Sequence, residues 1–109
     1  MTMQVQAVLQ VFLADPVRQR YGLELCEETG LPSGTVYPIL ARLEQIGWLD
    51  TRWEEPDAHV DAGRPRRRYY TITPDGVESS RDAIARTYAS RRRPVPGRLR
   101  RPRPAGGAS

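Results

Sequence analysis

Four arginines lie within five residues in the segment DAGRPRRRYYTIT (61–73), between a Gly–Pro turn and a run typical of a β-strand. Their guanidinium groups repel one another and add nothing to an apolar core. Such a cluster is either a solvated loop or a surface that binds a polyanion. Because each guanidinium is a planar fork that suits phosphate or guanine, nucleic acid is the polyanion that this chemistry favours.

The distribution of charge separates a basic tail from the rest of the chain. The 109 residues include 17 arginines and no lysine, and the formal net charge is +4. Residues 91–109 hold seven arginines, four prolines and no acid, so residues 1–90 carry 10 arginines against 13 acids, a net charge of −3. We expect one domain over 1–90 and a disordered tail over 91–109. The tail either contacts DNA phosphates whatever the base sequence, rests on the domain's acids, or has no role.

The composition argues against several kinds of site. Cys26 is the only cysteine and His59 the only histidine, so neither an internal disulfide nor a metal site of several soft ligands is expected. The sequence has no histidine–nucleophile pair and no phosphate-cradling glycine loop, so we expect no enzyme activity and no cofactor. No apolar run approaches membrane-spanning length and no signal pattern opens the chain, which predicts a soluble cytoplasmic protein without a membrane partner.

Hydrophobic spacing and turn residues indicate how the arginines are positioned. Val36, Ile39, Leu40 and Leu43 form one apolar stripe, which continues past Pro38, so we expect a distorted first turn there rather than a broken helix. Thr73 followed by Pro74 is a typical helix start. The expected helices cover residues 4–14, 19–29, 33–47 and 74–90, and the expected strands cover residues 48–55 and 67–73.

This order of elements predicts a winged helix-turn-helix, an α+β fold that is mostly α, with a two-stranded β-wing and a C-terminal helix. An ordinary pair of antiparallel helices is the alternative reading of residues 19–47 alone. In a winged helix the segment 33–46 is the recognition helix, and the wing spans about residues 56–67. The first and last helices carry more apolar surface than the core needs, so we expect a two-fold homodimer built from residues 4–14 and 74–90.

Two clusters of side chains are candidates for contact with double-stranded DNA. Small hydroxyl residues at the start of the third helix allow close approach, and the longer side chains on the same helix suit bases or phosphates. The wing arginines suit phosphates or a narrow minor groove. The alternative is that both clusters are only the solvated side of the domain. We expect Arg67 and Arg68 to balance wing acids such as Glu54. The candidate DNA-binding residues are Ser33, Thr35, Tyr37, Arg42, Arg64 and Arg66.

The sequence resembles the PadR family of winged-helix transcriptional regulators over roughly residues 5–80. The resemblance is carried by GLELCEETGLPSGTVYPILARLEQIGWL, RWEE and GRPRRRYYTITPDG. It implies a dimer whose third helix enters the major groove while the wing touches adjacent backbone or minor groove. Since the chain has room for a single C-terminal helix, it is similar to the short subclass of the family. The resemblance also implies a small aromatic effector at the dimer interface, for which Trp48 and Trp53 are candidates unless they belong to the core.

The leading function is therefore a sequence-specific, dimeric DNA-binding repressor. The alternative is a winged-helix module that binds protein rather than DNA, which the net negative charge of residues 1–90 favours. The position of the six candidate residues discriminates between these functions. For a DNA-binding protein they are expected to share one convex face that is free of acids.

Overall fold

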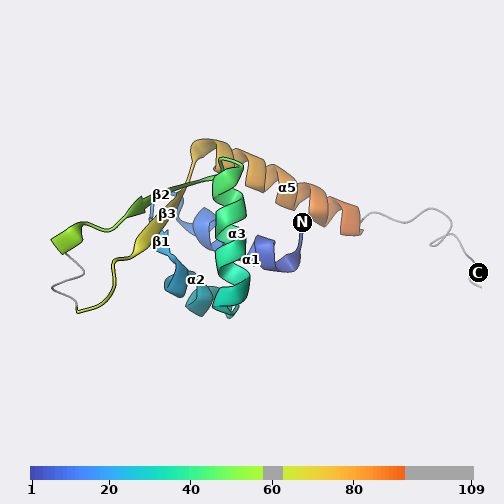
Figure 1. Ribbon diagram of the computed structural model, residues 1–109. Coiled ribbons are helices and arrows are strands. Elements are labelled where there is room, and N and C mark those ends of the chain that lie inside the picture. Colours follow the sequence, from blue (N-terminus) through green and yellow to red (C-terminus); the bar gives the residue numbers. More distant parts are fainter. Residues whose placement is uncertain (58–62, 93–109) are drawn as a thin grey trace, which may run out of the picture.

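The computed structural model describes residues 1–57 and 63–92, with the side chains of 91 and 92 left out. Figure 1 shows the wing and α5 extending to opposite sides of a helical body. Asp61 and residues 93–109 of the expected tail lie outside the described residues. The described elements are α1 (Met3–Ala14), β1 (Arg20–Tyr21), α2 (Gly22–Thr29), α3 (Ser33–Gln45), β2 (Leu49–Trp53), β3 (Arg68–Ile72) and α5 (Pro74–Arg92). This order confirms the predicted winged helix-turn-helix.

The core lies where α1, α2 and α3 meet the sheet. Phe12 of α1, Leu25 of α2 and Leu40 of α3 have no exposed surface, and Leu49 and Ile72 close the core from the strands. On α3 the buried residues recur at spacings of three and four, as the apolar stripe predicted. The helix runs through Pro38, which stands on its exposed side, so the expected continuation past this proline is confirmed.

The sheet has three antiparallel strands among the described residues, in the order β1-β3-β2. The β2–β3 ladder pairs Leu49 with Ile72 and Thr51 with Tyr70, which puts one apolar side of each strand on the core. The strand β1 was not predicted. The expected helix over residues 19–29 begins only at Gly22, because Arg20 and Tyr21 are extended and pair with β3.

Burial of Arg20 explains why β1 forms. This side chain is only 4% exposed. Its Nη1 donates to Glu28 Oε2 at 2.6 Å, and its Nη2 donates to the carbonyl of Val11 at 3.2 Å. Glu24 Oε1 accepts from the backbone N–H of Tyr21 at 3.4 Å and so satisfies a donor at the start of α2. The arginine thereby joins β1 to both α1 and α2.

The start of α5 is fixed against the turn that follows α3. Thr73 caps the helix as predicted, because its Oγ1 accepts from the N–H of Gly76 at 2.9 Å. The same hydroxyl donates to the carbonyl of Gly47 at 2.9 Å, and the N–H of Thr73 donates to the carbonyl of Trp48 at 2.9 Å. A Cβ at Gly76 would lie 2.3 Å from that Trp48 carbonyl oxygen, so only glycine fits.

The described parts of the chain contain neither a membrane-spanning helix nor a cluster of metal-ligating side chains. No helix within residues 1–57 and 63–92 is both long enough and apolar enough to cross a bilayer. Over the same residues, no three side chains among His, Cys, Asp and Glu gather in a way that would hold a metal ion.

Replacing Gly76 with alanine is expected to lower the free energy of unfolding by about 1–3 kcal/mol, because the added methyl group must displace backbone in a packed site. Gly34→Ala is the matched control. A Cβ at Gly34 meets no atom within 4 Å, and alanine is favoured over glycine in a helix by up to about 1 kcal/mol. Urea unfolding measures both changes. Wild-type stability in Gly76→Ala would contradict this account of the α5 junction.

Candidate nucleic-acid interface

The exposed face of α3 has small or uncharged residues along its middle and longer side chains at its edges. At 3.6 residues per turn, the middle is formed by Gly34, Pro38, Ala41 and Gln45, all exposed. Tyr37 and Arg42 stand at the two edges, about 140° apart around the axis. The helix backbone can therefore approach another surface closely along its middle, with a long side chain reaching out on either side.

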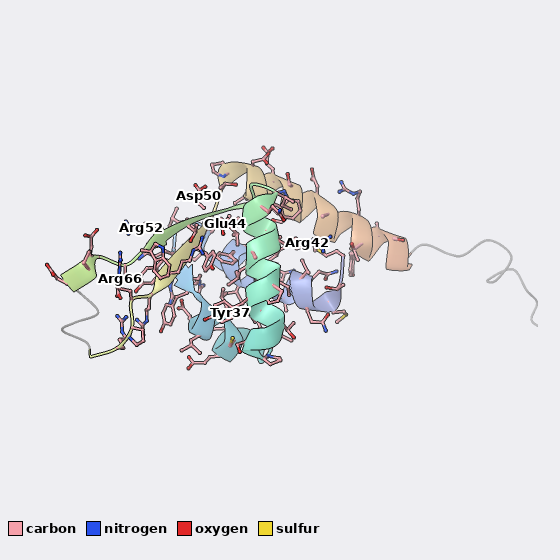
Figure 2. The ribbon with its side chains drawn as sticks, in the orientation of Figure 1. Tyr37, Arg42, Glu44, Asp50, Arg52 and Arg66 are labelled. Atoms are coloured by element: carbon pink, nitrogen blue, oxygen red, sulfur yellow. The ribbon has the colours of Figure 1, made fainter. Side chains whose placement is uncertain are left out.

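The predicted residues of α3 divide between these two edges. Tyr37 lies on the edge next to the wing, together with Ser33, and is 45% exposed. Thr35 is half-buried on the other edge, near Arg42. Figure 2 shows Tyr37 on the lower half of α3, and Arg66 out on the wing.

Glycine at the start of α2 makes room for the Tyr37 ring. A Cβ at Gly22 would lie 2.4 Å from three atoms of that ring, including its hydroxyl oxygen. Any larger residue would push the ring out of its position between α3 and α2. This requirement ties the geometry of the candidate interface to the unpredicted start of α2.

Glu54, which follows β2, organises the wing. Its side chain is 8% exposed, and its two carboxylate oxygens accept from Nη1 and Nη2 of Arg64, both at 2.7 Å. The backbone N–H of Arg67 donates to Glu54 Oε1 at 3.3 Å. The Glu54 backbone carbonyl accepts from Nε and Nη2 of Arg66 at 3.1 and 2.9 Å. One residue thus contacts three of the four arginines in the cluster.

These contacts also change the acidity of Glu54. The bonds from Arg64, helped by the Arg67 N–H and by both positive charges, lower the pKa of Glu54 from 4.5 to about 2, although burial acts in the opposite direction. The carboxylate is therefore ionised at any physiological pH. The same ion pair raises the pKa of Arg64.

The pairing of the wing arginines differs from the prediction. The sequence predicts that Arg64 faces DNA and that Arg67 and Arg68 balance the wing acids. In the structure, Arg64 forms the ion pair with Glu54. The Arg68 Nη2 instead reaches Glu44 of α3 at 3.2 Å, and the Arg67 guanidinium lies 3.9 Å from the centre of the Tyr21 ring. The expected pairing of Arg68 with a wing acid was wrong, because an ion pair depends on which way each side chain points across the hairpin, not on its spacing in the chain.

Two of the four arginines stay outside the ion pairs in the described part of the wing. Within the described residues, neither Arg66 nor Arg67 forms an ion pair with a carboxylate. The Glu54 carbonyl that holds Arg66 is neutral, and so is the ring beneath Arg67. In its described part, the wing therefore presents two guanidinium groups that no carboxylate pairs with directly.

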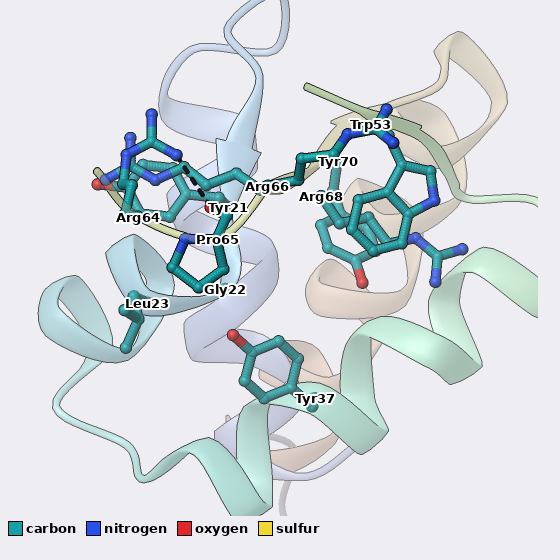
Figure 3. A pocket seen from close by; sticks show the side chains of 11 residues that line it. Tyr21, Gly22, Leu23, Tyr37, Trp53, Arg64, Pro65, Arg66, Arg68 and Tyr70 are labelled. Carbon is teal, nitrogen blue, oxygen red and sulfur yellow. Dashed lines mark hydrogen bonds between the residues drawn. The ribbon is translucent and has the colours of Figure 1, made fainter. Parts of the chain in front are cut away.

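A groove of about 480 Å³ lies between the start of α2, the wing-side edge of α3 and the wing (Figure 3). It brings together Tyr37, Arg64 and Arg66 of the predicted set, and none of the described residues that line it is an acid. Trp53 lines the groove, but Trp48 is half-buried against the core, so the two tryptophans do not form one pocket. The lining residues are Tyr21, Gly22, Leu23, Tyr37, Trp53, Arg64, Pro65, Arg66, Arg67, Arg68 and Tyr70.

The expected acid-free face is only partly present. Glu44 stands on the wing-side edge of α3, and Figure 2 shows it with Asp50 near the C-terminal end of that helix. Since Glu44 pairs with Arg68, its charge is compensated. Among the residues that the structure describes, the lower part of the same edge, at Tyr37 and the groove, carries no acid.

Lowering the pH is expected to remove the contribution of Glu54 to stability. A carboxylate whose pKa falls from 4.5 to about 2 on folding stabilises the native state above pH 4.5, and this contribution is lost as the pH falls toward 2. In urea unfolding at pH 6, the free energy of unfolding of the wild type should exceed that of Glu54→Gln. The difference between the two free energies should shrink at pH 2.5. The exposed neighbour supplies the control Glu55→Gln. A difference for Glu54→Gln that does not change with pH would refute the pairing.

Comparison with known proteins identifies relatives of this chain. Residues 12–82 match the model of the transcriptional regulator PadR-like family. The fold is similar to that of a PadR family transcriptional regulator from Eggerthella lenta DSM 2243, with 24% identity, a TM-score of 0.60, and coverage of 81% of this chain and 78% of that chain. None of the curated proteins matches.

Two further solved structures share the fold. A transcriptional regulator from Clostridium thermocellum has 23% identity and a TM-score of 0.59, over 80% of this chain and 82% of that chain. Overoxidized AbfR, solved bound to DNA, has 21% identity and a TM-score of 0.62, over 92% of this chain and 64% of AbfR. The family match covers more than half of the sequence and includes α2, α3 and the groove, so this chain belongs to the PadR-like family of transcriptional regulators.

Proposed function

We propose that this protein is a dimeric repressor that binds double-stranded DNA in the cytoplasm, with α3 in the major groove and the wing on adjacent backbone or minor groove. The main supporting observation is that Tyr37, on the exposed face of α3, lines one groove together with Arg66 and Arg67 of the wing, which form no ion pair among the described residues. Membership of a family of transcriptional regulators supports this function, as does the DNA-bound structure of AbfR, which shares the fold.

The face of α3 suits a helix that lies deep in a major groove. Gly34 and Ala41 have small side chains or none along the middle of this face, so bases can approach the backbone of α3. Gln45, on the same line, has the bidentate geometry that recognises adenine, and Arg42 at the edge suits guanine or a phosphate. Thr35, being half-buried, has less reach than these two residues.

The wing suits contacts that do not depend on sequence. Arg66 is exposed and held by the Glu54 carbonyl, so little side-chain freedom is lost when it meets a phosphate. Arg64 is occupied by Glu54, and its role is to position the wing. The arginines of residues 91–109 are proposed to add phosphate contacts of the same kind.

The proposed dimer uses α1 and α5. A groove of about 510 Å³ lies between these helices, lined by Leu13 of α1 and by Ile84 and Ala85 of α5, among others. Because α5 packs on its own chain mainly through α1, a second copy offers cover for the apolar part of this groove. The two α3 helices of such a dimer would read half-sites about 34–36 Å apart.

A module that binds protein is the second candidate. The net charge of −3 over residues 1–90 and the acid Glu44 at the edge of α3 favour it. Selection from a random duplex library at two salt concentrations separates the candidates. Recovery of a palindromic site supports the repressor, whereas failure to enrich any sequence at either salt concentration would favour the protein-binding module.

Substitutions on the two surfaces should have different effects on DNA binding. Gln45→Ala is expected to weaken the selected site by about 1–3 kcal/mol while leaving random DNA unaffected, because it removes a base contact. Arg66→Ala should weaken both DNAs equally and reduce the slope of log affinity against log salt by about 0.9 for one lost phosphate contact. Fluorescence anisotropy measures both. If Gln45→Ala weakened binding to both DNAs equally, Gln45 would contact the DNA phosphate backbone and not a base.

A carboxylate in the α1–α5 groove should dissociate the dimer. Ile84→Glu is expected to give a monomer, because it buries a charge at the proposed interface. Arg86→Glu adds the same group on the opposite side of α5 and should leave the dimer intact. Sedimentation velocity at micromolar concentration reports the mass of each variant. A monomeric wild type, with and without DNA, would exclude the proposed assembly.

A further inference from the structure

An acid stands on the edge of α3 that faces the wing. Glu44 follows Tyr37 by about two turns on this edge, and its side chain is 33% exposed. An α-helix with its side chains is about 10–12 Å wide, and the major groove of B-DNA is about 12 Å wide. The edges of a helix in that groove therefore face the phosphates rather than the bases. A carboxylate at such an edge repels DNA unless a cation lies beside it.

The cation beside Glu44 is Arg68 of β3. Its Nη2 donates to both carboxylate oxygens of Glu44, at 3.3 and 3.2 Å, and its Nε donates to Thr51 Oγ1 at 2.7 Å. The guanidinium carbon lies 5.8 Å from the centre of the Trp53 ring and 5.8 Å from that of the Tyr70 ring, and Figure 3 shows Arg68 beside both residues. One guanidinium is therefore held from two sides, by α3 and by the sheet.

One nitrogen of this guanidinium is left for a partner. Within residues 1–57 and 63–92, Nη1 of Arg68 forms no hydrogen bond. The side chain is 41% exposed and lines the groove between α3 and the wing. The N–H groups of Nη1 suit a phosphate oxygen. Because the other two nitrogens are already bound, little side-chain freedom is lost when Nη1 meets that oxygen.

We propose that Glu44 is a positioning residue for DNA binding: it holds Arg68 where Nη1 donates to a phosphate of the strand that passes between α3 and the wing. This inference rests on the proposed function and adds Arg68 to Arg66 as a phosphate contact. It gives an acid on the recognition helix a role in DNA binding, although by charge alone that acid opposes binding.

Two variants of equal charge separate positioning from charge. Glu44→Gln and Glu44→Ala each remove one negative charge, but glutamine keeps an oxygen that accepts from Arg68 Nη2 and alanine does not. We expect Glu44→Ala to bind DNA about three- to tenfold more weakly than Glu44→Gln, because an arginine that is not held must be ordered on binding. Fluorescence anisotropy measures both affinities on the selected DNA and on random DNA. Equal affinities of the two variants would overturn the proposal.

Removing Arg68 tests whether Glu44 acts through it. In an Arg68→Ala background, Glu44→Gln and Glu44→Ala should bind DNA equally, because no guanidinium remains to be held. Arg68→Ala alone should weaken binding to the selected and the random DNA by the same factor, since a phosphate contact carries no sequence information. A difference between the Glu44 variants that persists without Arg68 would refute the positioning role. A difference seen only on the selected DNA would indicate a base contact by Glu44 and refute it as well.

Asp50 supplies the matched control. It lies near the same end of α3 (Figure 2), is exposed, and forms no ion pair within the described residues. Asp50→Asn and Asp50→Ala should therefore bind DNA with equal affinity. Thermal unfolding checks that every variant is folded. A gap between the Asp50 variants as large as that between the Glu44 variants would count against positioning, because any lost amide near α3 would then have the same effect.

The hold on Arg68 is also measured without DNA, on the full chain labelled with ¹⁵N. The Nε–H signal of Arg68, assigned by its absence in Arg68→Lys, has a heteronuclear NOE that reports how rigid the side chain is. We expect this NOE to fall in Glu44→Ala and to be retained in Glu44→Gln, and an unchanged NOE in Glu44→Ala would overturn the proposal. If the wild-type chain binds no DNA, the proposed function fails and the phosphate contact fails with it. If it binds DNA and the two Glu44 variants do not differ, only the positioning role fails.

Discussion

Repulsion among the wing arginines is the constraint on which the candidate site depends. Four guanidinium groups within five residues can hold one geometry only if some of their charge is neutralised within the domain. Glu54 supplies this, because its carboxylate takes Arg64 in a bidentate pair and its carbonyl fixes Arg66. Glu44 does the same for Arg68 from the neighbouring helix. What remains, on Arg66 and Arg67, is the charge available to a partner.

Local periodicity was enough to predict most of the fold. The stripe of α3 and the Thr73 cap of α5 depend on neighbours three or four residues away, so the sequence records them directly. β1 was missed because two residues carry no periodic signal. It exists because Arg20 finds Glu28 and the Val11 carbonyl, and these contacts depend on how α1 and α2 pack.

The candidate site was less predictable for a similar reason. Tyr37, Arg64 and Arg66 do meet in one groove, as a recognition helix beside a wing requires. Which arginine is left unpaired depends on side-chain directions across a hairpin, and the sequence does not contain them. The sequence places both Trp48 and Trp53 in one expected strand, yet Trp48 lies before β2 and packs on the core, whereas Trp53 is the last residue of β2 and lines the groove.

The domain combines a net negative body with a local positive groove, and this affects what can bind. With a net charge of −3 over residues 1–90, the long-range field does little to attract a polyanion, so binding must depend on short-range contacts at Arg66 and its neighbours. The position of Arg66 in turn depends on the two hydrogen bonds that its guanidinium donates to the Glu54 carbonyl. Glu54 therefore controls which positive charge the wing offers, although its own carboxylate is occupied by Arg64.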